Sequence, residues 1–325
     1  MGTALRRLAV ASGELYVVFM VQKVQDVARQ IALDVVVGRL APGDPVPAVR
    51  TLAQQVGCSP GTAARAHTIL REAGVITGFP RSQAVVTPDG VAAAMVMSAR
   101  VGTMRLSGSD DPALDLLLSA VGRSVERAAG GRGSVAGLGL LAQGVVDAAA
   151  VHLRDARTGA SNDAFARRVL GGDPAMLVHL WSREQGIVVP QGNPMGIRGV
   201  TDLAGTRLAW RPHGTGSRLL LTRLLRDAGI EPPPEAELCD SHLGVAVTVA
   251  TGAADAGLAV RSVAESVDAE FVPIEWEDFE LAVEPESMGL LAPLLDVLAS
   301  STIQDRVSHL SGYDLRRSGD VRVAA

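Results

Sequence analysis

The chain has 325 residues, of which 47% are hydrophobic and 20% are charged; this composition is typical of globular proteins and excludes an intrinsically disordered chain. Its length suits two or three domains of about 100–200 residues each, and no apolar run reaches the ~18 residues that a membrane helix needs. The formal net charge is −5, but seven basic and five acidic residues lie between positions 21 and 90, so a slightly basic segment suited to a polyanionic partner precedes an acidic body.

The first 20 residues are expected to form an extension outside the domains. Arg6 and Arg7 precede an apolar stretch, as in a signal peptide, but Glu14 interrupts that stretch and no convincing cleavage site follows. Cys58 and Cys239 are far apart and lack metal-ligand spacing. We therefore expect two reduced thiols in a cytoplasmic protein, and no metal site.

Residues 21–90 have the pattern of three helices followed by two short strands. Apolar residues recur at near-helical spacing in the first helix, which Gly38 ends. Ser59 is a good N-cap for the third helix, with Pro60 at its first position. This order predicts a winged helix-turn-helix whose third helix enters the DNA major groove. The expected helices cover 21–37, 48–56 and 60–73, and the expected strands cover 75–77 and 84–87.

Two stretches of this segment, Gly38–Ala53 and Gly57–Ala66, closely resemble the GntR family of regulators. The resemblance implies binding to an operator in double-stranded DNA. The family often has a longer polar residue at the position of Gly61, so base readout is expected to be sparse. A solvated surface side chain is the alternative for each contact, and His67 is expected to be packed or on the surface. The implied DNA-contacting residues are Arg50, Ser59, Thr62 and Arg65 on the helices and Arg81 on the wing.

The body of the chain alternates strand-like and helical runs after a helical linker at 91–100. Such alternation predicts an α/β fold with a parallel sheet and ligand crevices at the carboxyl ends of its strands. Crossing segments near 186–190 and 269–274 predict two lobes that form a clamshell. We expect a ligand-sensing domain at 101–315, with lobe 1 at about 101–186 and 275–315, lobe 2 at about 190–272, and a tail at 316–325.

A series of short motifs in this body, which includes Leu106–Asp111, Arg183–Gly186 and Arg211–Arg218, resembles the PBP-like domain found beside helix-turn-helix modules. The resemblance implies a type II periplasmic-binding-protein fold that senses a small ligand, with molybdate or tungstate the ligands usually suggested. The chain departs from the family pattern at Trp210, where asparagine is usual, and in the exchanged Thr and Ser of its glycine loop. Trp210 is large enough to line a pocket for an organic metabolite instead.

Hydroxyls and backbone amides near helix starts favour an anionic ligand on physical grounds. Gly214-Thr215-Gly216-Ser217 opens a helix, so free N–H groups and the positive dipole end converge there. Capping alone is the alternative for the serines, bracing of the loop for the arginines, and a structural role for the histidines. The candidate ligand-binding residues are Ser109, Ser134, His152, Arg211, Thr215, Ser217, Arg218 and His242.

These patterns predict a ligand-responsive transcription regulator, a repressor that acts as a homodimer and needs no cofactor beyond its effector. An enzyme is the alternative of another class, but the chain has no nucleophile–base arrangement, and its glycine loop lacks the lysine of a phosphate-binding P-loop. A cytoplasmic small-molecule binding protein is a further alternative, which the winged helix argues against.

Overall fold

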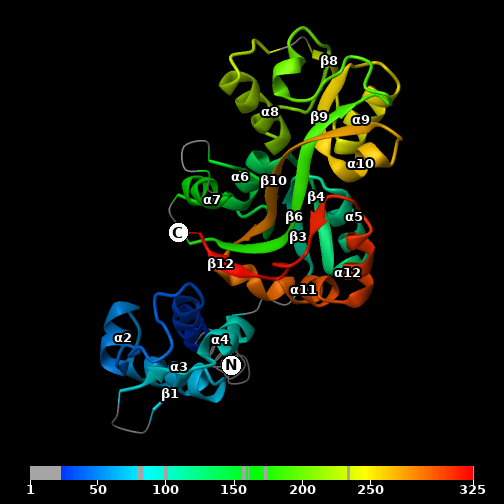
Figure 1. Cartoon of the computed structure of the whole chain (residues 1–325). Helices are drawn as coiled ribbons and strands as arrows, with labels where there is room; N and C mark the ends of the chain where they lie inside the picture. Colours follow the sequence, from blue (N-terminus) through cyan, green and yellow to red (C-terminus); the bar gives the residue numbers. More distant parts are fainter. Residues whose placement is uncertain are drawn as a thin grey trace, which may run out of the picture. The chain divides into compact units, whose positions relative to one another are not determined.

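The computed structural model describes residues 23–78, 83–98, 102–155, 159, 161–171, 174–232 and 235–324. The chain divides into two compact units, Met1–Arg100 and Val101–Ala325, each drawn in Figure 1. Within the described parts, we find no helix that combines the length and the hydropathy needed to cross a membrane.

The described residues of the first unit form four helices and a two-stranded antiparallel sheet. The Ser59 hydroxyl accepts a hydrogen bond from the Thr62 amide at 3.1 Å, and Pro60 begins the third helix, so its predicted N-terminus is confirmed. Buried Ile31, Leu70 and Ile76 join the helices to the sheet. The elements are a helix over residues 23–36, α2 (Val49–Gln55), α3 (Pro60–Glu72), β1 (Ile76–Thr77), β2 (Val85–Val86) and α4 (Gly90–Ser98).

The second unit is built on one mixed sheet with the strand order β4-β3-β5-β10-β6-β9-β7-β8. Strands β6 and β10 are antiparallel neighbours of 14 residues each and run through both halves of the unit, as the long green and orange ribbons of Figure 1 show. The strands are β3 (Met104–Gly108), β4 (Val125–Arg132), β5 (Ala148–Val151), β6 (Met176–Val189), β7 (Leu208–Trp210), β8 (Glu235–Leu238), β9 (Ala256–Val260), β10 (Glu270–Val283), β11 (Tyr313–Asp314) and β12 (Val321–Val323).

Parallel strands flank this central pair on each side and define two lobes. Lobe 1 contains β3, β4 and β5, and lobe 2 contains β7, β8 and β9. The α/β clamshell with an N-terminal winged helix-turn-helix, predicted from the sequence, is thus confirmed. The helices of the unit are α5 (Pro112–Val121), α6 (Ser134–Ala142), α7 (Asp163–Val169), α8 (Gly216–Asp227), α9 (His242–Ala250), α10 (Arg261–Glu265), α11 (Ala292–Leu298) and α12 (Ser301–Ser308).

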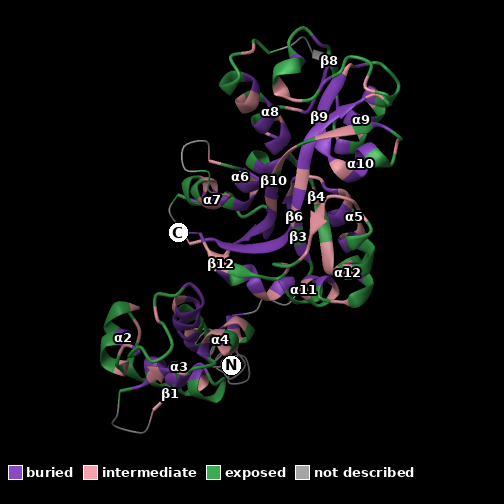
Figure 2. Cartoon of the chain, in the orientation of Figure 1, coloured by how far each residue is buried: buried purple, intermediate pink, exposed green. Residues whose placement is uncertain are grey.

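Burial on both faces of the sheet explains why the central strands are apolar. Strand β6 is almost wholly buried, and Figure 2 shows it in purple along most of its length. In lobe 2, Val188 packs in one core cluster with Val245 of α9, whereas the next residue back, Ile187, packs in another with Leu221 of α8. Consecutive residues of this strand therefore pack into the cores on opposite faces of the sheet.

The C-terminal end of the second unit differs from the expectation. The expected tail at 316–325 instead contains β12, which pairs with β6 and extends the sheet.

Candidate functional site

The third helix of the first unit exposes only part of its predicted DNA-contacting set. Arg50, at the second position of α2, and Arg65, on α3, are exposed, as a DNA contact requires. Thr62 is only 3% exposed and its hydroxyl lies 2.9 Å from that of Ser59, so these two residues cap α3 and Thr62 does not face outward. Arg81 lies outside the described residues.

His67 is buried in the first unit and is not available as a base reader. Its Nε2 lies 3.0 Å from the carbonyl oxygen of Pro47, and because a carbonyl only accepts, Nε2–H donates. Burial and the nearby Arg71 lower the pKa of His67, and the hydrogen bond to Pro47 only partly opposes them. The neutral ring therefore ties the loop before α2 to α3.

In the second unit, four helices begin where the two lobes meet. Asp111 caps α5 and Ser134 is the first residue of α6, both in lobe 1. Thr215 caps α8 and Ser241 caps α9, both in lobe 2. Each helix start follows a strand of its lobe, so the positive ends of four helix dipoles converge at the junction.

A salt bridge between Asp110 and Arg211 closes this junction. Asp110 follows β3 in lobe 1, and its carboxylate accepts two hydrogen bonds from the Arg211 guanidinium of lobe 2, at 2.5 and 3.2 Å. The backbone N–H of His242, the first residue of α9, donates to the same carboxylate at 3.2 Å. Lobe 2 thus holds a carboxylate of lobe 1 in an anion site made of a guanidinium and a helix N-terminus.

The protonation states at this bridge follow from burial and from the neighbouring charges. Burial alone would raise the pKa of Asp110, but the Arg211 guanidinium outweighs it and holds that pKa well below its usual range. Burial lowers the pKa of His242 well below its ordinary value, more than Asp110 raises it. His242 is therefore neutral, and Arg211 is the cation that stabilises the Asp110 carboxylate.

A second charged network lies behind this bridge, on the central strands. Arg183 of β6 is fully buried and donates to Asp111 at 2.5 Å and to Glu277 of β10 at 2.8 Å. Glu277 also accepts from Gln185 at 2.7 Å and lies 3.0 Å from Nδ1 of His152. Burial raises the pKa of Glu277, but His152 and Arg183 more than offset this effect, so the carboxyl is ionised.

The two predicted serines of lobe 1 lie side by side at the start of α6. The hydroxyls of Ser109 and Ser134 are 2.8 Å apart and fully buried, and the His152 amide donates to Ser134 at 3.2 Å. In lobe 2, Ser217 accepts a hydrogen bond from Gln185 at 3.3 Å, and Thr215 caps α8. The serine and threonine hydroxyls therefore lie on both sides of the junction.

Two glycines bring the lobes into close contact. A Cβ on Gly216, at the start of α8, would lie 2.3 Å from the His152 ring, and one on Gly133 would lie 3.0 Å from the carbonyl oxygen of Gly214. Backbone from lobe 2 approaches lobe 1 closely only because these side chains are absent.

Two cavities of about 250 Å³ each flank the closed junction, and both have walls from the two lobes. The first is lined by Asp110, Arg127 and His242, among others, and the second by His152, Arg223 and Glu277, among others. Several buried polar atoms of the described residues at the junction have no hydrogen-bond partner, as expected where a polar ligand or water binds. These atoms are Arg183 Nη2, Gln185 Oε1, Arg211 Nε and His242 Nδ1.

The structure brings most predicted ligand-binding residues together at the junction. Arg218 and the neighbouring Trp210 instead contact each other within lobe 2. Arg218 lies over the Trp210 ring at 3.9 Å and donates to the Arg211 carbonyl, so it braces the loop. Trp210 is 3% exposed and packs in the core of lobe 2, and neither of the two cavities is lined by it. These two cavities therefore give no support to a ligand pocket lined by Trp210, which stays a prediction.

Five residues at the junction were not among the predicted ones: Asp110, Asp111, Arg183, Gln185 and Glu277. The sequence did contain a signal for the strand residues. Arg183 and Gln185 lie two positions apart in a strand-like segment with apolar residues at both ends, which places both on one face of the strand. A charged side chain on a buried strand needs a partner, and partners of this kind gather at binding sites.

The chain therefore combines a winged helix-turn-helix unit with an α/β unit whose two lobes meet at a buried polar junction. Residues 23–86 match the model of bacterial regulatory proteins of the gntR family, and residues 117–299 match the PBP superfamily domain. The chain belongs to the PBP superfamily, with a GntR DNA-binding domain at its N-terminal side.

Two curated relatives carry no described activity. The chain is 32% identical over 195 residues to the uncharacterized protein YvgK of Bacillus subtilis, covering 58% of this chain and 63% of that protein. It is also 32% identical over 109 residues to the "Uncharacterized protein in ferredoxin 2Fe-2S gene 5'region" of Clostridium pasteurianum, covering 32% of this chain and 96% of that protein.

Similar solved structures include PhnD1 from Prochlorococcus marinus in complex with methylphosphonate, at 15% identity and a TM-score of 0.46, covering 66% of this chain and 93% of that one. The CcmR regulatory domain of Synechocystis in complex with 2-PG is 12% identical, with a TM-score of 0.43, covering 65% of this chain and 96% of that one.

Proposed function

We propose that this chain is a ligand-responsive transcription regulator that represses an operator in double-stranded DNA and acts as a cytoplasmic homodimer. The gntR match supports DNA binding, and the PBP superfamily match supports binding of a small molecule. Closure of the two lobes on the effector shifts the two winged helices of the dimer relative to their half-sites. A 10-fold preference of the effector for one state corresponds to about 1.4 kcal/mol of coupling. The chain acts by binding and not by catalysis.

The effector, in this proposal, is a small organic acid whose carboxylate binds Arg211. The single observation that carries this assignment is the Asp110 carboxylate, which accepts hydrogen bonds from both the Arg211 guanidinium and the N-terminus of α9. The same groups fit a free carboxylate of similar shape once the lobes open and Asp110 withdraws. Asp110 thus acts as an internal competitor for the site of the effector.

An oxyanion such as molybdate or tungstate is the second candidate. The paired hydroxyls of Ser109 and Ser134 and the His152 amide support it, because hydroxyl and amide donors suit a tetrahedral oxyanion. Asp111 and Glu277 weigh against it, since both bring negative charge to the same junction. An organic acid that also carries hydrogen-bond donors fits these carboxylates better than a dianion does.

Calorimetry and thermal unfolding of the full chain separate the two candidates. The probes are molybdate, tungstate, sulfate, phosphate and a panel of mono-, di- and amino-carboxylic acids. A specific ligand at 100 times its Kd stabilises the fold by about 2.7 kcal/mol. We expect a carboxylic acid to bind the wild type and to lose at least 100-fold in affinity with Arg211→Met.

Arg207→Met is the matched control, because Arg207 pairs with Asp255 in the same lobe, away from the junction. It is expected to bind as the wild type does. Binding of molybdate or tungstate that Ser134→Ala removes would instead establish the second candidate. Absence of binding by every probe would reject both effector classes, while DNA binding would still be measured separately.

A further inference from the structure

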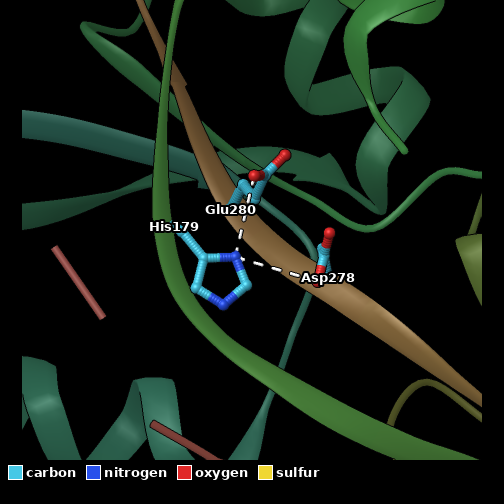
Figure 3. Close-up of side chains that lie close together, drawn as sticks. All are labelled: His179, Asp278 and Glu280. Carbon is cyan, nitrogen blue, oxygen red and sulfur yellow. Dashed lines mark ion pairs between the residues drawn. The ribbon is translucent and has the colours of Figure 1, made fainter. Parts of the chain in front are cut away.

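A second cluster of buried polar side chains lies on the central strands, away from the junction residues. His179 of β6 faces Asp278 and Glu280 of β10, and Figure 3 shows the imidazole pointing toward both carboxylates. Within the ladder, Glu280 pairs directly with His179, and the register shifts between Phe279 and Glu280. The neighbouring ladder partners Trp181 and Phe279 stack their rings beside this pair.

The distances between these groups are too long for hydrogen bonds. Nδ1 of His179 lies 3.7 Å from a Glu280 oxygen and 3.9 Å from an Asp278 oxygen, and the three atoms lie within 4.8 Å of one another. Two ligands bonded at about 2.0–2.2 Å to a tetrahedral Zn²⁺ lie about 3.4 Å apart. The two His179 distances need to shorten by a few tenths of an ångström, and the separation of the two carboxylate oxygens by up to about 1.4 Å, for the three atoms to bind one divalent cation.

The unpartnered atoms give an independent indication of a ligand. His179 is 1% exposed and Glu280 is fully buried, yet both ring nitrogens of His179 and Oε1 of Glu280 lack hydrogen-bond partners among the described residues. Leaving a buried carboxylate oxygen and a buried imidazole unpaired is costly, and a shared cation would satisfy both.

The surrounding side chains orient the carboxylates for such a cation. The second oxygen of Glu280 accepts hydrogen bonds from Asn162 at 2.8 Å and Arg322 at 2.7 Å, which leaves Oε1 toward His179. Ser182 donates to Asp278 at 2.9 Å. Partners of this kind fix the ligands of metal sites in proteins.

We propose that His179, Asp278 and Glu280 bind one divalent transition-metal cation, with Zn²⁺ as the type case. One imidazole and two carboxylates suit such ions, and Asp278, whose side chain is 22% exposed, leaves a route for a water to complete the coordination. The bound cation joins β6 to β10 and has a structural role. The site could not be predicted from the spacing of its ligands in the sequence, because the histidine lies about 100 residues from the carboxylates.

The test is metal binding by the full chain after dialysis against a chelator. Calorimetry with Zn²⁺, with Mg²⁺ for comparison, is expected to give one tight Zn²⁺ site and a raised Tm. Asp278→Asn and His179→Gln are expected to lower the Zn²⁺ affinity at least 100-fold, and Asp278→Asn, at a partly exposed position, is expected to stay folded. His309→Gln, at an exposed histidine, is the control that retains the site.

Co²⁺ spectra distinguish this site from binding at the cysteines, because a thiolate ligand adds a charge-transfer band that imidazole and carboxylate do not. Absence of a Zn²⁺ equivalent in the wild type, a thiolate band, or unchanged affinity in folded Asp278→Asn would each overturn the proposal.

Discussion

Individual side chains at the junction connect the two lobes of the second unit directly. The Asp110 carboxylate and the Arg211 guanidinium come from different lobes, so their bridge favours the closed arrangement. Arg211 is 4% exposed, and a buried guanidinium that loses its partner is destabilising. In the proposed function, the effector therefore replaces Asp110 as the partner of Arg211.

Asp110→Asn tests this competition directly. We expect tighter binding of a carboxylate effector, by about 10-fold, because Arg211 no longer has to leave an ionised partner. The free protein is expected to lose about 1–3 kcal/mol of stability for the same reason. Calorimetry and denaturant unfolding measure the two effects, with Asp255→Asn at the exposed Arg207 pair as control. Weaker effector binding in Asp110→Asn would mean that Asp110 contacts the effector.

His67 makes the stability of the first unit depend on pH. Because its pKa is lowered in the folded chain, the unfolded chain binds the proton more readily. The contribution of neutral His67 to the free energy of unfolding is therefore complete above the ordinary pKa of about 6.5. It is lost as the pH falls from 6.5 toward the lower pKa that His67 has in the folded chain. We expect His67→Leu to reduce the loss of Tm between pH 7.5 and 5.5; an equal loss in both proteins would contradict this account.

At the scale of elements, local sequence signals predicted most helices. They did not predict the strand and the salt bridge that form only through contacts between distant parts of the chain. Ser59 and Pro60 fix the start of α3 locally, so that boundary was predictable. Strand β4 has a charged and glycine-rich sequence, and its strand conformation comes from pairing with β3. The Asp110–Arg211 bridge was not predictable, because its partners are far apart in the chain and meet only when the lobes close.

The start of α8 gives a prediction at this scale. Gly216→Ala places a methyl group against the His152 ring and carbonyl, so the lobes cannot close as they do here. We expect at least a 10-fold loss of effector affinity, with DNA binding retained and a larger radius of gyration in solution scattering.

Gly139→Ala, also in a helix but with open space around its Cβ position, is the matched control and is expected to bind normally. Unchanged affinity in Gly216→Ala would show that closure does not require contact between α8 and His152.

For the whole molecule, the proposed function requires that DNA binding and effector binding be separable. Arg65 is exposed on α3, so Arg65→Ala is expected to weaken operator binding by about 10- to 100-fold, the equivalent of about 1–3 kcal/mol, and to leave effector affinity unchanged. A mobility-shift assay with the DNA upstream of the gene measures operator binding, and calorimetry measures effector affinity.

Arg71→Ala, exposed in the last turn of the same helix, is the control. Equal losses in both variants would mean that DNA contact is spread along α3 and is not centred on Arg65. Loss of effector binding in Arg65→Ala would contradict separable functions.

The two long strands β6 and β10 have a mechanical consequence. Because both lobes are built on this continuous pair, lobe motion bends and twists a two-stranded ribbon and does not swing on loose tethers. The ladder is interrupted by register shifts between Pro273 and Glu275 and between Phe279 and Glu280, so we expect the ribbon to bend at these two points. If the lobes move as proposed, the stiffness of this ribbon contributes to the free energy of closure along with the contacts of the effector.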